Sequence, residues 1–363
     1  MQINVKETEK ITSMPPSMLV SATYDNITRA AVLKFYEPVS QKLILWHDET
    51  GHKPYCYSRL SVDELDFLQE RDDILEIKTV KRHDLIKDEE INMSKITVAD
   101  PLTIGGTTGD KSIRNIIETW ESDIKYYENY LYDRSLIVGK YYEIVDGKIK
   151  PHDLEIADEV KLALKSLLWD KVDSENMVDP KEFKELISDW ADLLNQPIPR
   201  IKRLSVDIEV EAEIGRIPDP KVAEKKVTAI GLKGTDGFDQ IFVLRTEGTD
   251  EGVNELSQDI KIVFYDQSKE KEMILDAFKI IEEFPFVVTY NGDEFDLPYL
   301  FNRAERLGIK NENNPLYMMK DSATLKHGVH LDLYRTLSKR SFQIYAFSQK
   351  STDFSLNSVS KAL

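Results

Sequence analysis

The segment from Phe286 to Leu300, FVVTYNGDEFDLPYL, restricts the possible folds of this chain more than any other feature. It begins with a short, fully apolar run of the kind that forms a strand buried on both faces of a parallel sheet. The run ends in the polar turn Asn291-Gly292-Asp293, and Leu297-Pro298 then open a helix. This order predicts an α/β fold in which the polar turn lies at the carboxyl edge of the sheet.

The flanking segments supply the other elements of that fold. RLSVDIEV alternates as a strand should, and KVTAIGLKGTDGFDQIFVLR predicts an antiparallel hairpin. A helix with one apolar face follows in SKEKEMILDAFKIIEEF, another helix ends at Gly308, and VHLDLY predicts a further strand. Three antiparallel strands, a helix, a parallel strand and a helix make up an RNase H-like α/β domain.

The first part of the chain, from about residue 17 to about residue 150, is rich in predicted strands. SMLVSATYD, TRAAVLKFYE and KLILWHDE are β-type runs, and Asp146-Gly147 in YYEIVDGKIK indicates a hairpin turn. Two helical stretches lie between these strands, one from Ile113 to Trp120 and one in DIKYYENYLYD. These elements predict a β-rich α+β domain.

A helix over residues 180–195 connects the two parts. Its apolar residues fall on one face, Asp179 can cap it, and Pro197 and Pro199 end it. The chain of 363 residues is also too long for one ordinary core. We therefore predict an N-terminal domain over residues 1–195 and an RNase H-like domain over residues 196–363, incomplete at its C-terminus.

The composition limits the environment and the partners. No apolar run is long enough to span a membrane, the N-terminus has no signal-peptide pattern, and Cys56 is the only cysteine. The 48 basic and 65 acidic residues give a net charge of −17, which by itself argues against nucleic acid. Metal-dependent nucleases also concentrate acids, however, because bound cations reverse the local charge.

Two carboxylates in SVDIEV form the first candidate site. Asp207 and Glu209 are two residues apart on a predicted strand, so both point to one face while the apolar residues point to the other. Neighbouring carboxylates repel one another unless a cation compensates, and oxygen ligands suit Mg²⁺ or Mn²⁺. The Asp-x-Glu pattern also occurs three times in polar surroundings, where we expect solvated side chains.

Asp296 is the third candidate acid, because it follows the apolar strand at the edge where it can approach Asp207. Asp293 lies in the same loop, and we expect it to cap the following helix.

These segments closely resemble the Exo I (DIE) and Exo II (YNGDxFDxPYL) motifs of family B DNA polymerases, particularly the archaeal enzymes. GVHLDLYRTL, FSLNSVSKAL and TGHKPYCYS are also similar to segments of that family. The resemblance implies a 3′→5′ proofreading exonuclease that uses two Mg²⁺ or Mn²⁺ ions. It assigns the metal-binding acids to Asp207, Glu209 and Asp296, and contacts with the 3′ end of the DNA to Tyr290, Asn291 and Phe295.

The family's third exonuclease motif, Tyr-x₃-Asp, is expected after FSLNSVSKAL, and the chain ends at Leu363 before such a motif. Tyr142/Asp146 and Tyr317/Asp321 match the pattern but come too early in the order. The polymerase palm motifs are also absent. We therefore expect a fragment that does not polymerise and whose nuclease is impaired when isolated.

The resemblance further implies a pocket for deaminated template bases near Pro101, Ile104 and Ile124, although from the residues themselves we favour a hydrophobic core for all three. The alternative function is thus a non-catalytic module that binds single-stranded template and senses uracil. The implied partners are DNA (a single-stranded 3′ end or a primer–template), the remainder of the polymerase and a sliding clamp, in a cytoplasmic, nucleoid-associated location.

Two other patterns have ordinary structural explanations. His47, His52 and Cys56 lack the four closely spaced ligands of a structural zinc site. The tyrosines of YYENYLY could stack on bases, but their helical spacing favours packing.

Overall fold

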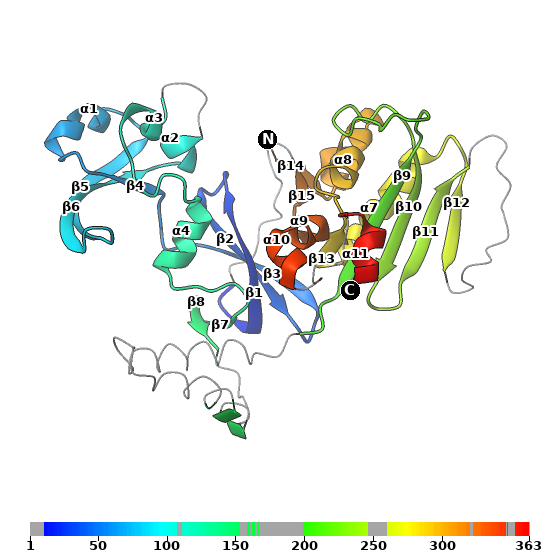
Figure 1. Ribbon diagram of the computed structural model, residues 1–363, viewed down its shortest axis with the longest axis horizontal. Helices are drawn as coiled ribbons and strands as arrows, with labels where there is room; N and C mark the ends of the chain where they lie inside the picture. Colours follow the sequence, from blue (N-terminus) through cyan, green and yellow to red (C-terminus); the bar gives the residue numbers. More distant parts are fainter. Residues whose placement is uncertain are drawn as a thin grey trace. The chain divides into compact units, whose positions relative to one another are not determined.

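The structure is a computed structural model that describes residues 11–106, 111–152, 199–245, 260–319, 322–345 and 353–362, with a few isolated positions between them. The chain forms two compact units (Figure 1). The first comprises Met1–Glu37 and Ile44–Ile198, and the second comprises Pro38–Leu43 and Pro199–Leu363. The predicted helix over residues 180–195 lies outside the described residues, so it stays a prediction.

The first unit contains a five-stranded sheet with the order β3-β2-β1-β7-β8. Its strands are β1 (Met14–Asp25), β2 (Ala30–Glu37), β3 (Lys42–His47), β7 (Tyr141–Val145) and β8 (Lys148–Pro151). The predicted hairpin is confirmed, since Val145 pairs with Lys148 around Asp146 and Gly147, which both have positive φ. Helix α4 (Tyr126–Asp133) packs against β1 and β2.

A three-stranded sheet with the order β4-β6-β5 completes the described part of this unit. Its strands are β4 (Tyr55–Ser58), β5 (Ile74–Asp84) and β6 (Glu89–Val98). The short helices beside it are η1 (Asp63–Leu65), α1 (Asp66–Gln69), α2 (Pro101–Gly105) and α3 (Ile113–Ile116). The predicted helix from Ile113 to Trp120 was wrong beyond Ile116, because the backbone of Trp120 pairs with that of Tyr57.

The second unit contains a six-stranded mixed sheet with the order β12-β11-β10-β9-β13-β16. Its strands are β9 (Arg203–Val210), β10 (Val227–Gly234), β11 (Asp239–Leu244), β12 (Lys261–Tyr265), β13 (Phe286–Thr289) and β16 (Val329–Asp332). Strands β9, β10 and β11 are antiparallel neighbours, and β13 lies parallel to both β9 and β16. This arrangement confirms the RNase H-like α/β fold. The edge strand β12, parallel to β11, was not predicted.

Helices α7 (Glu270–Glu283) and α8 (Asp296–Arg306) bury their apolar faces in one core with the sheet. The predicted apolar face of α7 is confirmed, since its buried hydrophobic residues are Met273, Ile274, Ala277, Phe278 and Ile281. One buried ion pair joins the two helices, because Arg303 donates to both carboxylate oxygens of Glu270 at 2.8 and 2.7 Å. Apolar packing and a bidentate pair therefore fix the helix that carries Asp296.

The remaining described elements are short. They are η2 (Asn311–Asn313), β14 (Leu316–Met318), β15 (Ala323–Leu325), α9 (Leu333–Leu337), α10 (Arg340–Tyr345) and α11 (Leu356–Ala362). The strand predicted in VHLDLY ends at Asp332, because that side chain caps α9 by accepting from the N–H of Tyr334 at 2.9 Å. Among the described helices, none is both long and apolar enough to cross a membrane.

Candidate active site

Strand β9 presents its acids on one face. Leu204, Val206 and Ile208 are buried, whereas Asp207 and Glu209 are exposed on the other side. The alternation predicted from SVDIEV is therefore confirmed. Both carboxylates are accessible to a ligand while the core holds the strand that carries them.

Asp296 approaches the same strand from the first turn of α8. Its side chain is only 5% exposed, and its Oδ1 accepts a hydrogen bond from the backbone N–H of Ile208 at 3.1 Å. Strand β13 pairs with β9 only as far as Ser205, so this N–H lies beyond the end of the ladder. Asp296 thus accepts the hydrogen bond that a longer β13 would accept, and this contact holds it next to Asp207.

The charges of Asp207 and Asp296 act on one another. Burial and the charge of Asp207 raise the pKa of Asp296 to about 6, and Asp332 contributes in the same direction. Loss of solvent contact also raises the pKa of Asp207, although part of this side chain reaches the surface. A divalent cation between these two carboxylates would relieve both effects.

Glu209 does not form a compact cluster of three carboxylates with Asp207 and Asp296. Within the described ranges, no three side chains of His, Cys, Asp or Glu are gathered tightly enough to hold a metal ion. The donors are nonetheless of the right chemistry, because Asp207 and Asp296 offer carboxylate oxygens and Glu209 lies on the same strand face. The structure therefore brings together two of the three predicted acids.

The loop after β13 is fixed by Asp332, a residue that was not predicted from the sequence. Its Oδ1 accepts from the N–H of Asn291 at 2.8 Å, and its Oδ2 accepts from the N–H of Asp293 at 3.0 Å. Asn291 has a φ of 67°, a left-handed conformation that asparagine tolerates better than most residues. Asp332 lies at the carboxyl end of the parallel strand β16, as the polar turn after Thr289 lies at the carboxyl end of β13. The rule that identified Asp296 could therefore also have identified Asp332.

Asp293 does not cap α8, contrary to our prediction. Its carboxylate pairs instead with Nδ1 of His330 at 3.1 Å and with Nε of Arg335 at 2.7 Å. Burial alone would raise the pKa of Asp293, but its hydrogen bond and electrostatic interaction with His330 and the charge of Arg335 hold the pKa below its ordinary value. Nε2 of His330 lies 2.8 Å from Oγ1 of Thr289, so this group links the loop to β13 and β16.

The aromatic residues predicted to contact DNA lie on both sides of this loop. Phe295 is half-buried and packs against Tyr299, with ring centroids 5.5 Å apart. Tyr290 packs edge-to-face against Tyr334 at 5.7 Å, and its hydroxyl donates to the carbonyl of Phe354. Asn291 is also partly accessible. All three predicted substrate contacts therefore lie close to Asp296 along the chain, and none is fully buried.

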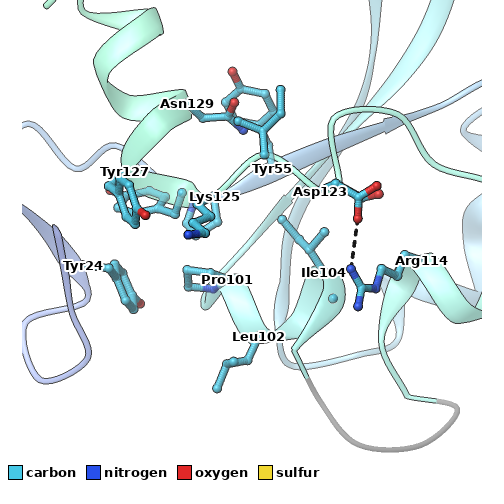
Figure 2. Close-up of a pocket in the computed structure, with 15 residues that line it drawn as sticks. Tyr24, Tyr55, Pro101, Leu102, Ile104, Arg114, Asp123, Lys125, Tyr127 and Asn129 are labelled. Atoms are coloured by element: carbon cyan, nitrogen blue, oxygen red, sulfur yellow. Dashed lines mark hydrogen bonds and ion pairs between the residues drawn. The ribbon is translucent and has the colours of Figure 1, made fainter. Parts of the chain in front are cut away.

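A separate cavity of about 300 Å³ lies within the first unit (Figure 2). Pro101, Ile104 and Ile124 all line it, together with four tyrosines: Tyr24, Tyr55, Tyr126 and Tyr127. Ile104 also belongs to the core beside β4 and β6. The three residues named from the sequence are thus neighbours around one cavity, and one of them serves the core as well.

The sheet order, with acids contributed by β9 and by the loop after the adjacent parallel strand, defines an RNase H-like domain with a candidate metal-dependent site. The chain belongs to the DNA polymerase family B, exonuclease domain family, whose model matches residues 117–359. Exonuclease domains of this family use divalent metal ions.

Similar proteins include DNA polymerase 1 from Sulfolobus acidocaldarius, which is 33% identical over 350 residues. DNA polymerase 1 from Saccharolobus solfataricus is 34% identical over 355 residues. Each match covers 95% of this chain, and the chain spans 38% of the length of each relative.

The family B DNA polymerase from the hyperthermophilic archaeon Pyrobaculum calidifontis has a similar solved structure, with a TM-score of 0.56 at 15% identity. That likeness covers 90% of this chain and 38% of the solved chain. At this identity it supports the fold alone.

Proposed function

We propose that this chain carries the 3′→5′ exonuclease site of a family B DNA polymerase and hydrolyses the 3′-terminal phosphodiester of DNA. The observation that carries the proposal is that the buried Asp296 is held on strand β9 beside Asp207, beyond the last residue of β9 that pairs with β13, in a chain of this family.

The position of each side chain indicates its role in the reaction. Asp207 and Asp296 would hold the metal, and Glu209, on the same face of β9, would orient the attacking water. Phe295 and Tyr290 lie in the segment that leads into Asp296, and an unpaired terminal base could stack on their rings without sequence preference. Asn291, fixed by Asp332, would hold the terminal nucleotide in register with the carboxylates.

The cofactor that fits these donors is a pair of Mg²⁺ or Mn²⁺ ions. When bound, the pair would supply an activated water and would stabilise the leaving 3′ oxygen. Burial of Asp296 favours its protonated form below about pH 6, so we expect ion binding and activity to increase above that pH.

The test is 3′ trimming of a mismatched primer–template with Mg²⁺, by this chain alone and combined with the remaining region of a family B polymerase. Asp207→Ala should abolish trimming. Asp239→Ala is the matched control, because Asp239 lies on β11 of the same sheet and pairs only with Lys233 among the described contacts. Undiminished trimming by Asp207→Ala would refute the assignment.

The cavity of the first unit favours a second function, recognition of a base from a single-stranded template. Tyrosine rings and the apolar side chains of Pro101, Ile104 and Ile124 form walls suited to the flat faces of an extruded base. Binding of uracil-containing single strands in the presence of a chelator, with a steep dependence on salt, would support it. Equal binding of strands with and without uracil would count against it.

The same proposal assigns the partners. DNA is the substrate, the remaining region of a polymerase would act with this chain, and a sliding clamp would hold the assembly on DNA. The corresponding location is the cytoplasm, associated with the nucleoid.

A further inference from the structure

The cavity of the first unit has a charged rim as well as an aromatic wall. Arg114 and Lys125 are the two basic side chains that line it. Lys125 is already engaged, since its Nζ lies 5.7 Å from the centre of the Tyr127 ring and a hydrogen bond to Tyr127 raises its pKa. Arg114 is the other basic group, and its side chain is 43% exposed.

The guanidinium of Arg114 lies close to the backbone of Gly105, which also lines the cavity. A Cβ atom at Gly105 would lie 2.9 Å from Nε of Arg114, so the absence of a side chain there leaves room for this close approach. Figure 2 shows Arg114 beside Ile104, across the cavity from Tyr24 and Tyr127. The guanidinium thus lies next to the apolar surface that a base would cover.

The ion pair between Arg114 and Asp123 is open to solvent. Nη1 of Arg114 lies 3.1 Å from Oδ1 of Asp123, whose side chain is 91% exposed, while that of Arg114 is 43% exposed. An ion pair this open to water contributes little to stability and separates readily. A phosphodiester is a better partner, because a guanidinium donates two parallel hydrogen bonds to its oxygens.

We propose that Arg114 binds the phosphate adjacent to the base held in the cavity, and that Asp123 is the counter-ion it releases when a strand binds. This inference rests on the proposed template-binding function and adds a residue that recognises the nucleotide backbone. When a base leaves the stack and enters the cavity, the phosphates on either side of it lie at the rim of the cavity. A cation at that rim therefore favours binding of a strand over binding of a free base.

The experiment measures binding of the whole chain to a fluorescent single strand that contains one uracil, by anisotropy over a range of salt concentrations with a chelator present. Arg114→Ala should weaken binding about tenfold and reduce the slope of log affinity against log salt by about 0.7, the loss of one phosphate contact. Arg114→Lys should recover part of the affinity, and Asp123→Asn should strengthen binding. Arg59→Ala is the matched control, because the side chain of Arg59 is 47% exposed, similar to that of Arg114, pairs with an aspartate (Asp84) and does not line the cavity.

A second measurement uses the native protein. A neutral methylphosphonate at a linkage next to the uracil should reduce wild-type binding about as much as Arg114→Ala does, and should have no further effect on that variant. Independent, additive losses would overturn the role of Arg114. If wild-type protein does not prefer the uracil strand, the template-binding function itself fails. A preserved preference with unchanged affinity and salt slope in Arg114→Ala refutes only the present inference.

Discussion

Asp296 accepts the backbone hydrogen bond of Ile208 at the point where β13 stops pairing with β9. The carboxylate therefore completes the sheet and also faces Asp207. One group satisfies a buried backbone donor and supplies a candidate metal ligand. Burial makes its charge unfavourable for folding, whereas metal binding requires that charge, so the two roles can be separated by experiment.

Asp296→Asn should stabilise the metal-free chain at pH 8. The amide keeps an oxygen for the N–H of Ile208 and removes a buried charge. The folded-state pKa of about 6 lies above the ordinary value of 3.8, so the folded chain binds this proton more tightly than the unfolded chain does. The carboxylate therefore destabilises the fold above pH 6, and this penalty disappears as the pH falls to about 4. We expect a gain of about 1–3 kcal/mol in urea denaturation at pH 8 and no gain at pH 4.

Asp293→Asn is the control for that experiment, because the linkage has the opposite sign. The pKa of Asp293 is held below its ordinary value, so this carboxylate stabilises the fold above its unfolded-state pKa. That contribution is lost as the pH falls through the folded-state pKa. Asp293→Asn should thus destabilise the chain at pH 8. A stabilisation by both substitutions would contradict the electrostatic account.

Mn²⁺ should raise the unfolding temperature of the chain at pH 8, and a chelator should reverse the change. Ligands that bind only the folded state stabilise it by mass action, and Asp207 and Asp296 are the neighbouring carboxylates available for this. Asp207→Asn should remove most of the Mn²⁺-dependent shift, while Asp239→Asn should retain it. Thermal unfolding monitored by circular dichroism with increasing Mn²⁺ measures this without requiring activity. An identical shift in Asp207→Asn would exclude Asp207 as a ligand.

Asp332→Ala should loosen the loop that carries Asn291 and Asp293. The substitution removes acceptors for three backbone N–H groups, those of Asn291, Asp293 and Tyr334. Hydrogen bonds to a charged acceptor are stronger than neutral ones, so we expect a loss of about 2–4 kcal/mol. Amide hydrogen exchange should accelerate at these three positions, whereas the amide of Met273 in α7 should retain more of its protection. Unchanged exchange at Asn291 would show that the loop does not depend on Asp332.

The sequence was sufficient to predict the elements whose physical signal is local. Alternation in SVDIEV fixed the shared face of Asp207 and Glu209, and the apolar run of β13 indicated a central parallel strand. The approach of Asp296 to β9 also followed from a general rule about the edges of parallel sheets. These predictions required only side-chain periodicity and the position of polar residues at strand ends.

The features that the sequence did not predict depend on contacts between segments that are distant along the chain. Strands β5 and β6 escaped detection because charged residues such as Lys78 and Arg82 interrupt their apolar alternation, while their pairing is fixed by cross-strand neighbours. The hydrogen bond from Ile208 to Asp296 exists only because β13 ends early. The ion pairs of Asp293 replaced the expected helix cap because β16 and α9 bring His330 and Arg335 to it.

Gly292→Ala should disrupt the same loop by steric overlap. A Cβ atom at this position would lie 2.3 Å from Oγ1 and 2.4 Å from Cβ of Thr289, which is buried at the end of β13. The loop must then move away from the strand, and the carbonyl of Gly292 would lose its hydrogen bond from the N–H of Leu297 in α8. We expect a loss of about 2–3 kcal/mol in urea denaturation. Gly231→Ala on β10 is the matched control, since its Cβ would meet only the carbonyl of Asp207 at an ordinary 3.8 Å. Thr289→Ala in the Gly292→Ala background should recover only a small part of the stability, because it removes Oγ1 but leaves the Cβ of residue 289 in the contact. If Gly292→Ala and Gly231→Ala unfold at the same urea concentration as the wild type, close packing of the loop against β13 is not what positions Asp296.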